Sequence, residues 1–443
     1  MSTIINAISS FLYSKLLVIM LIGTGLYFTV RARFPQLRLF RSACKAVMEK
    51  PEDDQSVSSF QALMVSTASR VGTGNIVGVS SAICIVGFGA VFWMWIIAIV
   101  GSASAFVEST LAQIYKKKGE DGRCYGGPAY YIEAALHSRP LAIAFCIAMI
   151  LTYAFGFNML ASYNLQSTFS GFSFYNPSVS LWIIGGILAV VTGWCLLGGG
   201  SRIVKVTSTL VPVMGIAYIA VALLVVILNI ANIPMVFATI FREAFDFRAI
   251  FGAFAGSALM QGIRRGLYSN EAGIGSAPNA AASAHVSHPV KQGLVQMLSV
   301  FIDTLLLCTA TAMMCMSSGI EPSAELQGAP WVQASLQASL GSFGPVFITV
   351  SMVLFAFTTL LGNCFYCDNL LTYIHKEQPG KRFMAGFRLV CATVVFVGAG
   401  MEMSMLWDIS DVLMGVMALI NIPVILVLSN TAMKAVKDYE KQL

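Results

Sequence analysis

The sequence predicts an all-α polytopic membrane protein in which two sets of five spanning helices form an inverted repeat. The 443 residues are 57% hydrophobic and only 11% charged, whereas soluble domains carry about 25% charged residues. Apolar runs of about 20 residues, long enough to cross a bilayer as a helix, recur along the whole chain. Two of these runs, one in each half, are interrupted by glycines and polar residues.

Eleven spans are predicted from the apolar runs. The first lies where a secretion signal would lie, but it lacks a small-residue cleavage site and ten further spans follow, so we expect a true helix. We expect one membrane domain with an extra N-terminal helix and cytoplasmic loop (1–57), a first repeat (58–229), an inverted second repeat (248–428) and a cytoplasmic tail (429–443). The spans lie near residues 9–30, 58–83, 90–115, 140–169, 179–198, 206–229, 248–284, 291–316, 344–374, 384–400 and 405–428.

Lys and Arg residues concentrate in alternate connections between the spans. The connections 171–178, 317–343 and 401–404 carry none, although Arg242 and Arg248 depart from the pattern. Cytoplasmic loops carry the excess of positive charge, so we expect the amino terminus outside, the carboxyl terminus in the cytoplasm, and the chain in the cell (inner or plasma) membrane. The net charge of +6 is then a topology signal rather than a nucleic-acid-binding patch.

The stretch SRVGTGNIVG, residues 69–78, interrupts the second span. Glycines weaken a helix and allow close backbone approach, and unwound backbone at membrane depth persists only where it lines a protein cavity. Such a break frees N–H groups that attract an anion and carbonyl groups that attract a cation. A helix-packing face would explain the glycines, but not the costly Arg70 and Asn75. We therefore interpret the stretch as half of a binding site.

A second interruption lies in the seventh span, between Arg264 and Ala284, and again contains a G-x-G, at Gly273 and Gly275. Each interrupted span is followed by four further spans, and the two interrupted spans start on opposite sides of the membrane. Paired glycine interruptions in an inverted repeat indicate the central binding site of a secondary transporter.

Five ordered motifs carry a resemblance to a known family. They are VGTGNIVGVSSAI (71–83), GFGAVFWMW (87–95), GGPAYYIEAAL (126–136), RGLYSNEAGIGSAP (265–278) and FAFTTLLGN (355–363). The chain resembles the alanine or glycine:cation symporter family. That resemblance implies a leucine-transporter-like fold of ten core helices, with one extra N-terminal helix, and sodium-coupled import of small neutral amino acids.

The resemblance also implies the roles of individual residues. Amides at the first break would receive the substrate carboxylate, carbonyls near Leu267, Tyr268 and Ser269 its ammonium, and the Tyr268 ring would cover it; a packing role for this ring is equally compatible with the residue alone. The coupling sodium ion would be held by the hydroxyls of Thr358 and Thr359 and the carbonyls of Ala68 and Val71, although membrane threonines often bond to their own helix. The implied substrate residues are Gly72, Thr73, Gly74, Asn75, Ala161, Tyr268, Ser269, Asn270 and Asn363.

Two positions depart from the family pattern. Asn363 stands where relatives usually show a tryptophan, and Ala161 stands where they often have a glutamine. If both positions line the site, the pocket is larger and more polar than one built for alanine or glycine. The substrate expected from the resemblance is alanine or glycine, and the departures favour a larger polar neutral amino acid such as glutamine.

Several charged residues within the spans have open interpretations. Glu108 and Asp303 are expected to be ion-pair partners or helix-end groups, and Glu271 either accepts backbone N–H bonds within the break or contacts the ammonium. Arg264 and Arg265 either face an aqueous vestibule or place the true break earlier, around 252–257. For Arg70 we expect an ion-pair gate on the cytoplasmic side.

Other functional classes are disfavoured by the sequence. No HExxH, GxSxG or acidic pair supports an enzyme, and no repeated pore motif supports a channel, so we expect no catalytic residues. A proton-coupled carrier of the same fold stays open beside the sodium-coupled one. We expect no cofactor besides the coupling sodium ion. The expected partners are an amino acid, sodium and the lipid bilayer, with no nucleic acid and no obligate protein partner.

Overall fold

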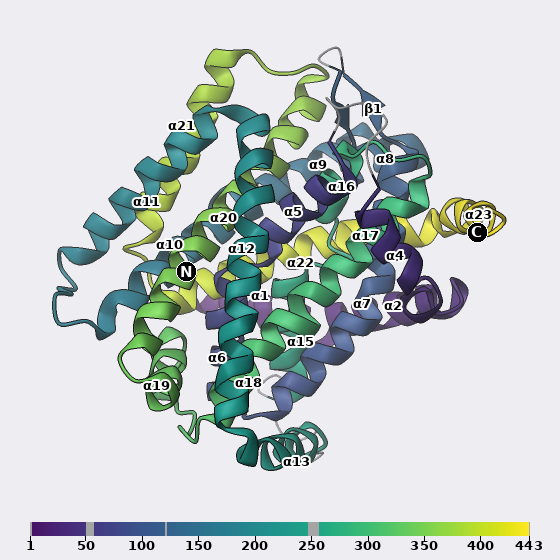
Figure 1. The fold of residues 1–443 in the computed structure, drawn as a ribbon. Coiled ribbons are helices and arrows are strands. Elements are labelled where there is room, and N and C mark those ends of the chain that lie inside the picture. Colours follow the sequence, from purple (N-terminus) through teal and green to yellow (C-terminus); the bar gives the residue numbers. More distant parts are fainter. Residues whose placement is uncertain (1, 50–56, 120–121, 247–256, 443) are drawn as a thin grey trace.

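The computed structural model describes residues 2–49, 57–119, 122–246 and 257–442, and this part of the chain is almost entirely helical (Figure 1). Its described strands are β1 (Lys117–Lys118) and β2 (Cys124–Tyr125), which form a short antiparallel hairpin. We use this hairpin to name one end of the molecule, the hairpin end, and the helix α13 (Ile233–Ala244) to name the other.

The chain begins with helices that precede the first break. The helices α1 and α2 are joined by a π-helical segment without a break in the helical backbone, and two short helices follow. The bounds are α1 Ser2–Phe11, η1 Leu12–Leu17, α2 Val18–Arg31, α3 Pro35–Arg38 and α4 Phe40–Val47.

The second predicted span is a broken helix. It starts at a capping box, in which the side chains of Ser58 and Gln61 satisfy each other's backbone N–H groups. It runs as α5 (Ser59–Arg70) and resumes as η2 (Gly74–Gly78) and α6 (Val79–Val86), with a bend of 51° between the halves. The segments that follow are α7 Gly89–Ile114, α8 Pro128–Leu136, α9 Arg139–Ile150, η3 Leu151–Gly156, α10 Phe157–Thr168, η4 Phe169–Gly171, α11 Ser180–Leu197, α12 Gly199–Leu228, η5 Ile230–Asn232 and α13.

The second half of the chain repeats this arrangement with another broken helix, α15 (Ala258–Asn270) and α16 (Ala277–Ser283). Figure 1 shows α5 and α16 toward the hairpin end and α6 and α15 toward the α13 end, so the two broken helices run in opposite directions. The later segments are α17 Pro289–Val300, η7 Phe301–Cys308, α18 Thr309–Ser317, η8 Ala324–Leu326, α19 Ala329–Leu340, α20 Phe343–His375, α21 Lys381–Gly398, α22 Met403–Val427 and α23 Ser429–Glu440.

Within the described residues, seven helices are long and apolar enough to cross a membrane, or eight if the bent pair α5–α6 is one span. Three predicted spans remain. The span 9–30 overlaps the shorter apolar helix Val18–Arg31, 248–284 lies partly outside the described residues, and 384–400 overlaps Lys381–Gly398, which is not among the seven. The all-helical membrane architecture is confirmed, whereas the count of eleven stays a prediction.

The broken helices pack against long continuous ones. The helix α7 contacts α15, α16 and α17, while α5 contacts α12 and α20. Both breaks therefore lie in the interior, and residues 68–78 and 266–276 are buried almost throughout.

Candidate functional site

The first break spans Val71 to Thr73, between α5 and η2. The N–H of Gly72 donates to Oδ1 of Asn75 at 2.9 Å, and the N–H of Asn75 donates to the Gly72 carbonyl at 3.2 Å. The side chain of Asn75 thus holds the turn, while the first N–H groups of the outer half, at Thr73 and Gly74, have no acceptor within their own helix. This arrangement is suited to an anion such as a carboxylate.

Glycine is required at this break because other elements approach the backbone closely. A Cβ atom added to Gly72 would overlap Oγ1 of Thr359, and one added to Gly74 would lie 2.5 Å from the ring of Tyr268. The structure therefore brings together four of the residues that the sequence assigned to the site.

The second break spans residues 271–276 and contains three residues with left-handed backbone. Glu271, Gly273 and Gly275 have φ angles of 54°, 85° and 89°, which end α15 and redirect the chain. The alternative break at 252–257 falls almost wholly outside the described residues. The hydroxyl of Ser257 caps the start of α15 by accepting from the Met260 N–H.

Glu108 of α7 holds the second break open. Its carboxylate accepts the N–H groups of Gly273 at 3.2 Å and Gly275 at 3.1 Å. Asn421 of α22 donates to the same carboxylate and to the Gly273 carbonyl, at 2.9 Å each. Of the two roles left open for Glu271, the backbone bonds are made by Glu108 instead; Glu271 accepts from the hydroxyls of Ser276 and Ser69, and its contact with the ammonium stays a prediction.

The end of α15 offers free carbonyl groups. The Leu267 carbonyl, one of those expected to face the substrate ammonium, already accepts the N–H of Glu271 at 2.8 Å. The carbonyls of Tyr268, Ser269 and Asn270 follow it at the helix terminus, where intrahelical donors are missing. The Asn270 side chain accepts the N–H of Ala272 and so belongs to the turn itself.

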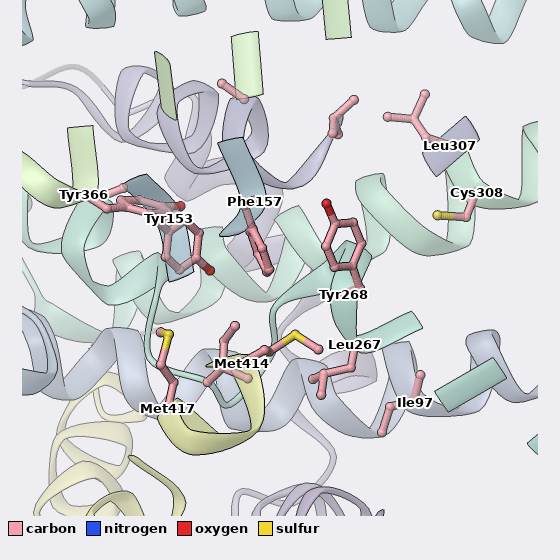
Figure 2. Close-up of a cluster of buried hydrophobic side chains, with 14 of the residues drawn as sticks. Ile97, Tyr153, Phe157, Leu267, Tyr268, Leu307, Cys308, Tyr366, Met414 and Met417 are labelled. Carbon is pink, nitrogen blue, oxygen red and sulfur yellow. The ribbon is translucent and has the colours of Figure 1, made fainter. Parts of the chain in front are cut away.

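Tyr268 lies in an aromatic cluster over the first break. Its ring centroid is 4.8 Å from that of Phe157 on α10 and 4.7 Å from that of Trp407 on α22. Figure 2 shows Phe157 between Tyr153 and Tyr268. The position fits a ring that covers a ligand at Gly74.

Asp303 in η7 links the two breaks. Its carboxylate accepts from Nδ2 of Asn75 and from Oγ of Ser269, both at 2.7 Å, and from Thr304. A residue of each broken helix is thus bonded to the same buried group, so a displacement of one half affects the other.

The predicted sodium ligands lie where α20 meets the end of α5. The oxygen Oγ1 of Thr359 is buried and has no hydrogen-bond partner in the described part of the chain, as expected of a hydroxyl that serves as a cation ligand. The carbonyls of Ala68 and Val71 belong to the terminal turn of α5, which has free acceptors. The hydroxyl of Thr358, in contrast, donates to the carbonyls of Leu354 and Phe355 of its own helix.

Asn363 is occupied by protein groups at both ends of its amide. Oδ1 accepts from Ser69 at 2.7 Å, and Nδ2 donates to Oδ1 of Asn158 at 2.9 Å. Ala161 is fully buried one helical turn beyond Phe157. A direct substrate contact of Ala161 or Asn363, and with it a larger pocket, remains a prediction.

Arg70 is buried in the middle of the charged residues. Within the described part of the chain its guanidinium donates to the Gln296 carbonyl at 3.4 Å, and no described carboxylate lies within 4 Å of it. Glu108, Glu271 and Asp303 all lie within electrostatic reach of its guanidinium. Arg70 therefore forms no ion pair within the described residues, and a role as a cytoplasmic gate stays a prediction.

Arg264 and Arg265 share one counter-charge within the described part of the protein. Asp411 of α22 lies 4.0 Å from Arg264 and 3.3 Å from Arg265. The guanidinium groups also stack on Tyr13 and Trp407, at 4.8 and 3.9 Å. These contacts partly offset the cost of burying the two guanidinium groups, and the aqueous vestibule and the earlier break both stay predictions.

A cavity of about 900 Å³ opens at the hairpin end. It is bordered by Gln61 of α5, Asn279 of α16 and Asn369 of α20, so it leads toward the inner halves of both broken helices. Nδ2 of Asn369 donates to Oδ1 of Asn279 at 2.6 Å at this border.

Sequence reasoning missed three residues beside the site: Phe157, Asn164 and Trp407. Asn164 donates to the hydroxyl of Thr73 at 3.0 Å. The signal was present, because an amide in an apolar span is costly unless it has a partner or a function. The pairing of Asn164 with Thr73, however, was not predictable, because the two residues are 91 positions apart in the sequence.

The two broken helices run in opposite directions and pack against continuous helices, with free N–H and carbonyl groups buried at the breaks. This arrangement is typical of a secondary membrane transporter. A family model of the "Sodium:alanine symporter family" matches residues 1–443, and the chain belongs to this family. The chain is thus a multi-span membrane protein of a symporter family, and it is classed with transporters rather than with enzymes. The resemblance seen in the motifs is confirmed.

Curated relatives agree with this assignment. The amino-acid carrier protein AlsT of Bacillus subtilis is 45% identical over 100% of this chain and 92% of its own length. The probable sodium/glutamine symporter GlnT of the same species is 41% identical over 99% of this chain and 91% of its own length. The sodium/alanine symporter AgcS of Methanococcus maripaludis is 35% identical, with 99% and 97% covered.

Among solved structures, the chain is similar to MhsT, crystallised in complex with L-phenylalanine. The TM-score is 0.56 at 14% identity, and the match covers 87% of this chain and 98% of the other. The similarity shows a shared fold, and the predicted leucine-transporter-like fold is confirmed.

Proposed function

We propose that this protein imports a neutral amino acid by using the sodium gradient, with the substrate bound between the two broken helices. The observation that carries the proposal is the meeting of the breaks: the N–H groups at Thr73 and Gly74, the ring of Tyr268 and the unpartnered hydroxyl of Thr359 lie together. An amino acid needs donors for its carboxylate and acceptors for its ammonium, and the ends of broken helices supply both.

Sodium would be held by Thr359 and the carbonyls of Ala68 and Val71, with Thr358 as a further oxygen. Because these carbonyls belong to α5 and the hydroxyls to α20, a bound cation would fix the broken helix to the continuous one. Gly72, in contact with Thr359, would transmit that constraint to the turn that receives the carboxylate. Sodium and substrate would therefore favour the same arrangement of α5, which is the basis of coupling.

Alternating access would proceed from this central site. The cavity at the hairpin end is the route toward the side that the charge pattern predicts to be cytoplasmic. On the α13 side, the cluster of Tyr268, Phe157 and Trp407 closes over the break. The described arrangement fits a carrier that releases its substrate through the hairpin end.

The test is uptake of labelled amino acids into proteoliposomes with an imposed sodium gradient. We expect accumulation of alanine, glycine or a larger polar neutral amino acid such as glutamine. Replacement of sodium by choline should abolish it. Uptake that persists in choline and follows a pH gradient would contradict sodium coupling.

A proton-coupled carrier of the same fold is the second candidate, and one observation favours it. Glu108, Glu271 and Asp303 are fully buried and share Arg70 as their recorded positive partner in the described chain. Burying uncompensated carboxylates is costly, so a proton is a natural additional partner. The same assay with a pH-sensitive dye inside the vesicles distinguishes the two cases.

A further inference from the structure

The helix α10 presents one face to the first break. Phe157, Ala161 and Asn164 are spaced four and three residues apart, so they lie on the same side of the helix. Phe157 packs against Tyr268, and Asn164 bonds to Thr73, which places both ends of this face beside the turn. The small Ala161 lies between them.

Asn164 is satisfied at only one end of its amide. Nδ2 donates to Oγ1 of Thr73 at 3.0 Å, while Oδ1 is buried and accepts no hydrogen bond from the part of the chain that the structure describes. Its side chain is fully buried. A buried acceptor without a donor is unfavourable, and such an atom at a binding site indicates a ligand group.

The neighbouring hydroxyl groups do not supply the missing donor. Ser167 and Thr168 both donate to the main-chain carbonyl of Asn164, at 2.9 and 2.8 Å. The hydroxyl of Thr73 already accepts from Nδ2 and also interacts with the phenol of Tyr268.

A second amide on the same helix shows the contrast. Asn158 donates to the carbonyl of Ala154 at 3.3 Å, and its Oδ1 accepts from Asn363 at 2.9 Å. Both of its ends are engaged by protein groups. Of these two amides, only Asn164 leaves an acceptor for something that is not part of the protein.

We propose that Asn164 determines substrate specificity by accepting a hydrogen bond from a donor in the substrate side chain, either a carboxamide N–H or a hydroxyl. This assignment rests on the proposed function, because it requires the substrate at the first break. The carboxylate lies at the amides of Thr73 and Gly74, and the side chain extends along Ala161 toward Asn164. A substrate with an apolar side chain leaves Oδ1 without a donor, so the site disfavours it.

The test compares three labelled substrates, L-glutamine, L-serine and L-alanine, in sodium-driven proteoliposomes. In Asn164→Ala we expect kcat/KM to fall by roughly tenfold or more for glutamine or serine, which is the effect of losing one hydrogen bond. For alanine we expect a change of less than about threefold, because its side chain has no donor. Asn158→Ala is the matched control, and any loss there should be the same for all three substrates.

Two outcomes overturn the assignment. One is an equal fall for all three substrates in Asn164→Ala, which would mean that the residue contacts the common backbone of the amino acid or only supports Thr73. The other is a wild-type protein that transports alanine but neither donor-bearing substrate. If Asn164→Ala does not reach the membrane, kcat/KM for glutamine and serine relative to that for alanine is measured in Asn164→Ser.

A different result would show that the proposed function itself is wrong. A wild-type protein that takes up no amino acid under a sodium gradient removes both the function and this assignment. A normal wild-type uptake with unchanged selectivity in the Asn164 variants removes the assignment alone.

Discussion

Thr358 and Thr359 are adjacent on α20, yet their hydroxyls have different surroundings. Oγ1 of Thr358 donates within its own helix, whereas Oγ1 of Thr359 faces Gly72 and has no partner in the described residues. The sequence predicted the pair but gave no reason to rank its members. The ranking depends on which side of α20 touches α5.

Thr359→Ala is expected to raise the KM for sodium by roughly tenfold or more, because it removes an oxygen ligand that the remaining carbonyls cannot replace. Thr358→Ala should have a smaller effect, since its hydroxyl proton is already engaged. The measurement is initial uptake as a function of sodium concentration in proteoliposomes.

Thr209 provides the control for that experiment. It is exposed on α12, and its hydroxyl bonds to the Lys205 carbonyl in the same way as a membrane threonine usually does. Thr209→Ala should leave the KM for sodium unchanged. Equal sodium dependence in Thr359→Ala and the wild type would remove Thr359 from the ion site.

For individual residues, the sequence predicted which ones lie at the breaks better than it predicted their hydrogen-bond partners. Asn75, Tyr268 and Thr359 lie at the breaks as expected, because their motifs fix their place along the chain. The partners of Asn363 and Glu271 were not predictable, since each hydrogen bond joins segments that only the tertiary fold brings together. A single sequence carries no direct record of such contacts.

The second break is an element with its own conformational requirements. Gly273 and Gly275 both have left-handed backbone, but their surroundings differ. A Cβ on Gly273 would have its nearest neighbour at 3.4 Å, while one on Gly275 would lie 2.7 Å from Pro128 and 2.8 Å from Phe145.

Gly275→Ala is expected to destabilise the protein more than Gly273→Ala, because overlap adds to a backbone cost of about 1–2 kcal/mol that both share. Gly319→Ala is the control for the backbone cost alone, since Gly319 has a φ of 81° and no atom within 4 Å of an added Cβ. Thermal unfolding in detergent measures the order. A melting temperature of Gly275→Ala at or above that of Gly319→Ala would contradict the expected overlap.

The contact between α15 and α22 depends on one carboxylate. Asp411→Asn would leave Arg264 and Arg265 buried without a counter-charge, and removing one partner of a buried pair costs about 3–5 kcal/mol. We expect a large fall in the melting temperature. Glu133→Gln, which breaks the partly exposed pair with Arg139, should cost less than about 1 kcal/mol. Similar melting temperatures for the two variants would show that the pairing with Asp411 is weak.

Element boundaries were largely predictable, because hydropathy and glycine interruptions act locally. The exact place of the second break was not, since the sequence around it contains glycines at 252, 256, 262 and 266 as well as at 273 and 275. What selects 271–276 is a carboxylate on another helix, Glu108, which accepts the freed N–H groups.

For the whole molecule, the charge pattern predicts which end faces the cytoplasm. Ser201 borders the cavity at the hairpin end, and Ser178 is exposed in the connection at the other end of α11. Because the connection near Ser201 is positively charged and the one at 171–178 is not, we expect these two serines on opposite sides of the membrane.

Cysteine labelling in intact cells checks this orientation. In a variant in which the exposed Cys44 is replaced by serine, Ser178→Cys should react with a membrane-impermeant maleimide, whereas Ser201→Cys should react only after permeabilisation. The Cys44→Ser parent without an added cysteine gives the background. The reverse pattern would invert the predicted topology and the direction of release through the cavity.

The hydrogen bonds of Glu108 and Asn421 to residues 273–275 should make this segment rigid. Irregular backbone is usually the part that opens most readily, but here the N–H groups of Gly273 and Gly275 donate to Glu108 of α7. Asn421 of α22 donates to the Gly273 carbonyl and to Glu108, and all of these groups are buried. Hydrogen–deuterium exchange should therefore be slower at Gly273 and Gly275 than in the exposed connection around Gly319. The second break would then stay rigid while the transporter changes conformation, and the flexible segments would be the connections at the periphery.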